Sequence, residues 1–417
     1  MKIRIFAALI ASTLTFASAQ TEVVWWDFLG GGDGVRMKAI IDEFNATHDD
    51  IQINATTLEW GTPFYTKVQT SAAVGEQPDI MTYHLSRFPL GLEQGVLRPI
   101  SEAEMNAAGL GLDEYQPGLI EAATYDGNLY GVPLDVHSII MYYNADILEE
   151  VGLLGADGKP AGLDGIDNFN AALAAVADAG YNPLSISTLQ DGGTVYRILY
   201  TLLNQRGGSL ISEDAVLIDD DTQTVLDTMR GWVANGYANA DVDYPSSVAL
   251  FTEGNTAFHI NGVWEVPTMV DLEAGGDFFN WGAIAVPTLF DSPATWADSH
   301  VFAIPESAAN PVSDDKVAAV MEVIAWINKN SLSWASAGHI PAYTPITDSA
   351  EYQALEPNAT YAVLAENAVF DPRSTIAGVA SPLYDAFLNY VEPAINGQLP
   401  TDQAVEMMKM ELEAQLR

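Results

Sequence analysis

Along the chain, segments in which apolar side chains recur every three or four residues alternate with segments in which every second side chain is apolar. Residues 21–28 are β-branched and aromatic and lead into glycines at 30–34, which is typical of a strand that ends in a loop. In residues 37–44 apolar side chains recur every three or four positions, and in residues 51–55 every second side chain is apolar. This order predicts a strand, a helix and a second strand.

The same alternation continues along the chain. Further patterns predict strands at 79–83 and 139–144 and helices at 64–74, 169–179, 196–204, 317–327 and from 402. No repeat of fixed period is present, which argues against a solenoid or a propeller. Helices that alternate with strands predict an α/β fold with mainly parallel sheets. The length of 417 residues is enough for two or three domains, and we expect two.

The first nineteen residues have the composition of a cleavable secretory signal. Lys2 and Arg4 precede an apolar run at 5–16, and Ala17-Ser18-Ala19 supplies small residues for cleavage before Gln20. The apolar run is too short to span a bilayer. We therefore expect a freely diffusing secreted or periplasmic protein, and the absence of cysteine excludes a lipid-modified N-terminal cysteine and disulfides.

The charge balance restricts the partners. The chain has 16 basic and 56 acidic side chains and a formal net charge of −40. Binding to nucleic acid depends on neutralisation of phosphates by Lys and Arg, so a nucleic-acid partner is excluded, and an acidic membrane surface is disfavoured for the same reason. The acidic residues are scattered, as expected for a solvated surface.

Local motifs for catalysis or metal binding are absent from the sequence. None of the six histidines lies three or four residues from another, the spacing of metal ligands on a helix, and there is no Gly-x-Ser-x-Gly motif. We therefore expect no cofactor and no metal. Carboxylates are too numerous to identify the acid and base of a glycosidase, so that possibility stays open.

Two features are suited to a hydroxylated ligand. The glycine loop at 30–34 lacks the spacing of a nucleotide-binding motif, but it presents backbone donors beside Asp33; a simple turn is an equally good interpretation. Nine Trp and seventeen Tyr offer flat faces that can stack on sugar rings, although each of these side chains is more often part of a core.

Four segments in a specific order resemble one known family. They are residues 77–80 (QPDI), 130–134 (YGVPL), 257–264 (AFHINGVW) and 337–341 (AGHIP). The chain resembles the extracellular solute-binding proteins of ATP-driven importers, the group that includes the maltose-binding and glycerol-3-phosphate-binding proteins. The resemblance implies a two-lobed periplasmic-binding-protein fold of type II, with the ligand in the cleft between lobes. The implied lobes are residues 20–132 plus 297–341 and residues 133–296 plus 342–417.

The resemblance also implies ligand-binding residues. Tyr83 and Trp264 match stacking aromatics of the maltose-binding pattern, Arg87 matches a basic residue and Asp33 an acidic acceptor of hydroxyl hydrogen bonds. His137 stands where that pattern has a glutamate, which changes the expected sugar. Further candidates are Trp60, His84, Asp191, His300 and Arg373.

The function implied is capture of a mono- or oligosaccharide and its delivery, without catalysis, to the permease subunits of an inner-membrane ABC transporter. We expect a monomer that does not insert into the membrane. Two alternatives remain open at this point. One is a binding protein for a phosphorylated polyol such as glycerol 3-phosphate, and the other is a secreted glycosidase or lyase.

Overall fold

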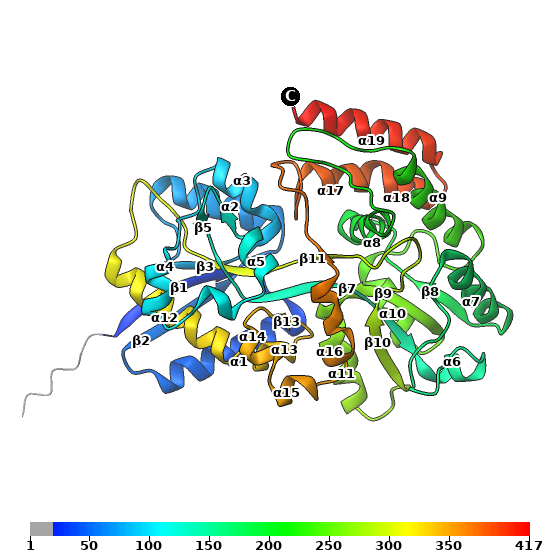
Figure 1. Cartoon of the computed structure of the whole chain (residues 1–417), viewed down its shortest axis with the longest axis horizontal. Helices are drawn as coiled ribbons and strands as arrows, with labels where there is room; N and C mark the ends of the chain where they lie inside the picture. The colour runs from blue at the N-terminus through cyan, green and yellow to red at the C-terminus, as the bar shows by residue number, and fades with distance from the viewer. Residues whose placement is uncertain (1–19) are drawn as a thin grey trace, which may run out of the picture.

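The computed structural model describes residues 20–417, and two β-sheets organise them (Figure 1). The predicted signal at residues 1–19 lies outside the described residues. The first sheet has the order β2 (Ile51–Thr57), β1 (Thr21–Asp27), β3 (Ile80–His84), β12 (His300–Ala303) and β6 (Val132–Pro133). The second has the order β14 (Ala368–Val369), β11 (Thr295–Asp298), β7 (Asp135–Asn144), β9 (Thr256–Gly262) and β8 (Asn182–Ser185), and β10 (Trp281–Ala285) and β13 (Ile340–Pro341) also pair with β7.

Helices from the first third of the chain and α12 surround the first sheet, in the left half of Figure 1. They are α1 (Gly31–Thr47), α2 (Thr62–Val74), α3 (Phe88–Glu93), α4 (Glu102–Ala107), α5 (Pro117–Ala122) and α12 (Asp314–Lys329), with the short helices η1 (Leu85–Arg87) and η2 (Leu112–Glu114) and the hairpin β4 (Thr124–Tyr125) and β5 (Asn128–Leu129). Local signals define several ends. At the start of α4, Ser101 and Glu104 form a reciprocal capping box.

The second sheet is covered by a larger set of helices, in the right half of Figure 1. They are α6 (Ala145–Glu150), α7 (Ile166–Asp178), α8 (Gly192–Gln205), α9 (Asp220–Ala234), α10 (Tyr244–Thr252), η3 (Val263–Glu265), α11 (Val266–Ala274), α17 (Pro382–Ala386), η5 (Phe387–Val391), α18 (Glu392–Ile395) and α19 (Thr401–Gln415). Short helices lie between the two halves, low in Figure 1: α13 (Leu332–Ala335), α14 (Thr344–Thr347), α15 (Ala350–Gln353), α16 (Asn358–Tyr361) and η4 (Ala362–Glu366).

The α/β fold class is confirmed, but the strand directions are mixed rather than mainly parallel. In the first sheet, β1 is parallel to β2 and β3 because helices connect these strands, while β12 runs antiparallel to β3. In the second sheet, β7 pairs antiparallel with β9, β10, β11 and β13. The difference arises because β7 enters this sheet directly from the first one, and its neighbours return toward that entry.

The chain passes between the sheets at two single residues. Leu134 separates β6 in the first sheet from β7 in the second, and Ser299 separates β11 from β12. Near the first passage, β13 returns from the side of α12 and pairs with Val136 and Asp135 of β7. These passages fall next to the boundaries at 132/133 and 296/297 expected from the resemblance. The assignment of whole lobes to those ranges stays a prediction.

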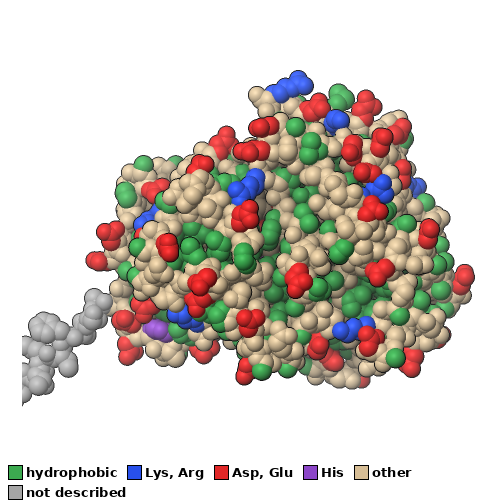
Figure 2. Space-filling model, viewed as in Figure 1, with side chains coloured by type: hydrophobic (Ala, Val, Ile, Leu, Met, Phe, Trp, Pro, Cys, Tyr) green, Lys and Arg blue, Asp and Glu red, His purple; other side chains and the backbone are tan. Residues whose placement is uncertain are grey.

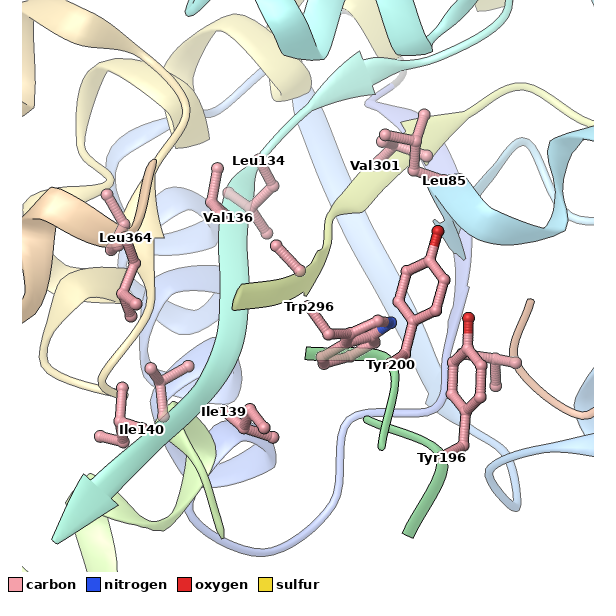
Figure 3. Packing of buried hydrophobic residues seen from close by; sticks show 14 of the residues in the cluster. Leu85, Leu134, Val136, Ile139, Ile140, Tyr196, Tyr200, Trp296, Val301 and Leu364 are labelled. Carbon is pink, nitrogen blue, oxygen red and sulfur yellow. The ribbon is translucent and has the colours of Figure 1, made fainter. Parts of the chain in front are cut away.

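The hydrophobic core is continuous along β7, all ten residues of which are buried. Figure 3 shows Val136, Ile139 and Ile140 on this strand and Leu134 just before it, with Leu85 of η1 and Val301 of the first sheet beyond its start. Tyr196 and Tyr200 of α8 and Trp296 of β11 pack on the same side as each other, beside the strand. One strand therefore supports the cores of both halves.

The surface matches the charge expected from the sequence. On the face shown in Figure 2, Asp and Glu are scattered among few Lys and Arg and form no single dense patch. Among residues 20–417, no helix combines the length and the apolar character needed to cross a membrane.

Candidate functional site

Four of the six histidines of the chain meet where the two sheets join. His84 ends β3 and pairs in register with His300, which begins β12; His137 lies on β7, and His339 directly precedes β13. The ring centroid of His300 lies 4.2 Å from that of His137, 5.2 Å from that of His84 and 5.3 Å from that of His339. All four side chains are buried. Connections between the sheets therefore bring together residues that are far apart in sequence.

Asp135, the first residue of β7, is the acceptor at the centre of this group. Its carboxylate lies 3.1 Å from His137 Nδ1, 2.8 Å from His300 Nδ1 and 3.3 Å from His339 Nδ1. It also accepts hydrogen bonds from the backbone N–H of His300 and from Trp334 Nε1, at 2.9 and 2.8 Å. Burial alone would raise the pKa of Asp135, but His300 and His339 hold that pKa well below its usual range. Burial lowers the pKa of His137 to about 3, and the neighbouring His300 adds to this shift.

His339 lies between two carboxylates. Its Nε2 is 3.1 Å from Asp33 Oδ2, in the first turn of α1, and its ring stacks on Trp334 with centroids 4.5 Å apart. Burial would lower the pKa of His339, but the charges of Asp33 and Asp135 raise it above its usual value. Gly338 allows this position, because its φ is +91° and a Cβ there would lie 2.0 Å from the carbonyl oxygen of Val263.

A buried guanidinium stacks between two indoles beside the histidines. The guanidinium carbon of Arg197, on α8, lies 4.6 Å from the ring centroid of Trp296 and 4.9 Å from that of Trp264. Trp264 is half-buried in η3, and its Nε1 donates to Tyr244 Oη at 2.8 Å. The ring of Trp264 lies 6.1 Å from that of His137. Aromatic faces and a planar donor therefore line one wall of the site.

Two buried carboxylates, Asp298 and Asp371, have raised pKa values. Asp298 accepts hydrogen bonds from the N–H and the Oγ of Ser86 and from the N–H of Ser299, yet burial raises its pKa to about 6. Asp371 accepts from Tyr196 Oη and Trp296 Nε1. Burial and the nearby charge of Asp298 raise the pKa of Asp371 to about 7. Burial therefore favours the protonated form of both carboxyl groups more than water does.

Residues 371–381, which we call the strap, leave the second sheet and contact the first half of the molecule. The N–H of Val379 donates to Ser86 Oγ at 3.3 Å, and Arg87 Nη1 donates to the carbonyl of Ala380 at 3.2 Å. A Cβ on Gly378 would lie 2.3 Å from the carbonyl oxygen of Ser86. Arg87 also stacks on Tyr65, with its guanidinium carbon 4.4 Å from the ring centroid. The strap thus covers the junction between the two halves.

Several polar atoms around the junction are buried and, within residues 20–417, have no hydrogen-bond partner. They are Asp33 Oδ1, Arg87 Nε, Asp191 Oδ2, Arg197 Nε, Asp371 Oδ2, Ser374 Oγ and Ser381 Oγ. A buried polar group without a partner costs about 1–3 kcal/mol, so such groups need an explanation when they gather in one place. They are the donors and acceptors that a polyhydroxylated molecule uses.

The structure brings together only some of the residues expected from the sequence. Asp33, His84, His137 and His300 belong to the buried group, and Trp264 borders it. Arg87 lies under the strap, and Asp191 caps α8 by accepting from the N–H of Thr194.

The other three expected residues lie outside the group of buried histidines. Tyr83 packs inside the first half, 6.1 Å from Phe88 by ring centroids; Trp60 is 47% exposed, with its ring 6.3 Å from His84; and Arg373 is exposed and donates to the carbonyls of Glu121 and Thr124. The ligand-binding role of all ten residues stays a prediction.

Sequence reasoning missed seven members of the site: Asp135, Arg197, Trp296, Asp298, His339, Asp371 and Tyr384. Asp135 and His339 stand within or beside two of the segments that carried the resemblance, which was an unused signal. Arg197 gave none, because an arginine in an amphipathic helix normally faces solvent.

Comparison with known proteins decides the family. The family of bacterial extracellular solute-binding proteins matches residues 39–360. This chain belongs to that family. Among the relatives of this solute-binding protein is a maltooligosaccharide ABC transporter solute-binding lipoprotein of Streptococcus pneumoniae, 23% identical over 78% of this chain and 73% of the relative. A lactose-binding protein of Rhizobium radiobacter is 25% identical over 70% of this chain and 67% of the relative.

Solved structures agree on the fold of this solute-binding protein. The GacH receptor of Streptomyces glaucescens matches it with a TM-score of 0.78 at 16% identity, over 95% of this chain and 99% of that one. The two-lobed fold implied by the resemblance is therefore confirmed.

Proposed function

We propose that this solute-binding protein captures a carbohydrate between its two halves and delivers it unaltered to the permease of an ABC transporter. The observation that carries the proposal is Arg197 stacked between Trp264 and Trp296 beside buried polar atoms without partners. The relatives named above, which are described as binding maltooligosaccharides and lactose, support the same ligand class.

The chemistry of the wall matches a sugar ring. The apolar face of a pyranose can lie on Trp264, as aromatic rings bury large apolar areas while leaving their edges to polar neighbours. Arg197 and Asp371 each present an atom without a partner, so a pair of adjacent hydroxyl groups can satisfy a donor and an acceptor at once. Because the surrounding side chains are buried, each such bond is stronger than it would be in water.

Membership of the family supports the remaining parts of the proposal. The protein acts outside the cytoplasm, as a monomer of two lobes divided near residues 132/133 and 296/297, and it catalyses no reaction. Closure of the lobes on the sugar forms the surface that the permease recognises.

Binding is tested with a carbohydrate panel that includes maltooligosaccharides and lactose. We expect one sugar class to raise the melting temperature and to titrate with one molecule per chain by calorimetry. Trp264→Ala is expected to weaken that binding, while Trp326→Ala, a half-buried tryptophan that packs on Phe44 in the first half, is the matched control. No binding to any sugar would refute the proposal, and chromatographic detection of cleaved sugar would refute the absence of catalysis.

Glycerol 3-phosphate is a second candidate with its own observation. Arg87 and Arg197 are both buried, and neither Nε has a partner within the described residues, so two guanidiniums are available to an anion. Competition calorimetry separates the candidates. Displacement of glycerol 3-phosphate by a neutral sugar favours the carbohydrate, whereas binding of glycerol 3-phosphate alone favours the phosphorylated polyol.

A further inference from the structure

The connections between the two halves converge on a single group of side chains. Asp135 and His137 follow the passage at Leu134, His300 follows the passage at Ser299, and His339 precedes β13, which pairs with β7 beside Asp135. One ligand atom from each of these four residues lies within 4.8 Å of the ligand atoms of the other three, and all four residues are buried.

The distances suit a small divalent cation. Tetrahedral Zn²⁺ has bonds of about 2.0–2.1 Å to imidazole nitrogen and carboxylate oxygen, which places its ligand atoms about 3.3 Å apart. The three Nδ1 atoms lie 2.8, 3.1 and 3.3 Å from the nearer oxygens of Asp135. A donor set of three imidazoles and one carboxylate also binds Zn²⁺ in preference to Mg²⁺ or Ca²⁺.

Neighbouring groups orient these ligands as they do in known metal sites. Trp334 Nε1 holds Asp135 Oδ2 at 2.8 Å, and Asp33 Oδ2 lies 3.1 Å from His339 Nε2, on the side of the ring away from Asp135. A carboxylate behind a ligating histidine fixes the ring and raises its basicity. Within residues 20–417, neither nitrogen of His339 forms a hydrogen bond of normal angle, although the side chain is fully buried. An Asp33 carboxylate also balances the charge that Zn²⁺ leaves on three neutral imidazoles and Asp135.

We propose that Asp135, His137, His300 and His339 form a structural zinc site that joins the connections between the two lobes. The overlapping set of His84, His137 and Asp298 is also close enough to share an ion. It is less suited, because Asp298 already accepts three hydrogen bonds and His84 Nδ1 is bonded to Tyr65 Oη. The proposed site needs no carbohydrate and does not depend on which ligand the lobes bind.

The test uses the mature chain without an affinity tag, stripped with a chelator and titrated with Zn²⁺ and with Co²⁺ as a spectroscopic probe. We expect one ion per chain, the visible absorption of tetrahedral Co²⁺, displacement of Co²⁺ by Zn²⁺ and a higher melting temperature with either metal. His300→Gln and His339→Gln should each weaken Co²⁺ binding by at least about 100-fold, and Asp33→Asn by about 10-fold to 100-fold.

Two controls make the result specific. His259→Gln replaces a histidine that is equally buried on β9, where it bonds to the carbonyl of Ser185, and should leave Co²⁺ binding unchanged. His84→Gln should also preserve the Co²⁺ spectrum, and loss of that spectrum would overturn the assignment of ligands.

Weak binding of several ions per chain, insensitive to the histidine variants, would mean attraction to the acidic surface and would refute the site. No binding to the wild-type chain would refute it independently of any variant's folding. A sugar-binding titration of the same stripped protein tests the proposed function separately.

Discussion

Replacing Asp371 by Asn should stabilise the protein at neutral pH and remove part of its pH dependence. Asn keeps the shape of the side chain and an oxygen that accepts from Tyr196 Oη and Trp296 Nε1. It removes a charge that is buried and close to Asp298. The charge of Arg197 lowers the pKa of Asp371 but does not cancel the effect of burial.

The magnitude follows from the two pKa values of Asp371. In the folded protein its pKa is raised to about 7 from an ordinary value of 3.8. A carboxyl with a raised pKa destabilises the fold when it is ionised. This cost is fully present above pH 7 and is relieved as the pH falls through the folded pKa toward the unfolded one. Since one pKa unit corresponds to about 1.4 kcal/mol, the full cost is on the order of 4 kcal/mol, of which about 2–3 kcal/mol is relieved between pH 8 and pH 5.

Urea unfolding at pH 5, 6, 7 and 8 measures this term as the difference between parent and variant. We expect Asp371→Asn to be more stable than the parent at pH 8, and the advantage to shrink by about 2–3 kcal/mol at pH 5. Asp348→Asn, which removes an exposed charge, should show no such change. In Asp298→Asn the pH window should move down, because a charge that raises the pKa of Asp371 is gone. Parallel pH profiles for the parent and Asp371→Asn would refute the reasoning.

Three further results are expected. Trp264→Ala should weaken sugar affinity by about 1–3 kcal/mol in calorimetry because a stacking face is lost, and an equal loss of stability without sugar would instead assign Trp264 to the core. Gly338→Ala should lower the free energy of unfolding by about 1–3 kcal/mol, since the residue has a positive φ and its Cβ would overlap the Val263 carbonyl; an unchanged urea midpoint would contradict this. Ser101→Ala should cost about 0.5–2 kcal/mol through loss of the capping box on α4, and Ser333→Ala, at an exposed position outside any capping box, serves as the comparison.

The sequence predicts the regular elements well, because their signals are local. The helix expected from the apolar spacing in 37–44 is α1, and the strand expected at 79–83 is β3 at Ile80–His84. The strand expected at 139–144 begins four residues earlier, at Asp135. Its polar start is not typical of a buried strand. It can be buried because His300 and Trp296 of other segments form hydrogen bonds with Asp135 and Ser138, while His137 is bonded to Asp135 itself.

The site is less predictable for a physical reason. Local spacing along the chain can show ligands on one helix, but His84, His137, His300 and His339 come from four separate segments. Their proximity is decided by the order of strands in two sheets. The sequence expectation of no metal rested on that local spacing alone, and the arrangement in space leads to the opposite proposal.

The short connections at Leu134 and Ser299 also determine where fluorescent labels should be placed to detect a movement of the two halves. In the closure proposed above, the two halves rotate near these residues, so displacement grows with distance from them. The chain contains no cysteine, so thiols introduced at exposed Thr70 on α2 and at exposed Gln398 before α19 would be the only two positions labelled. A donor and an acceptor fluorophore at these two positions would report a small rotation of the two halves as a measurable change in energy transfer.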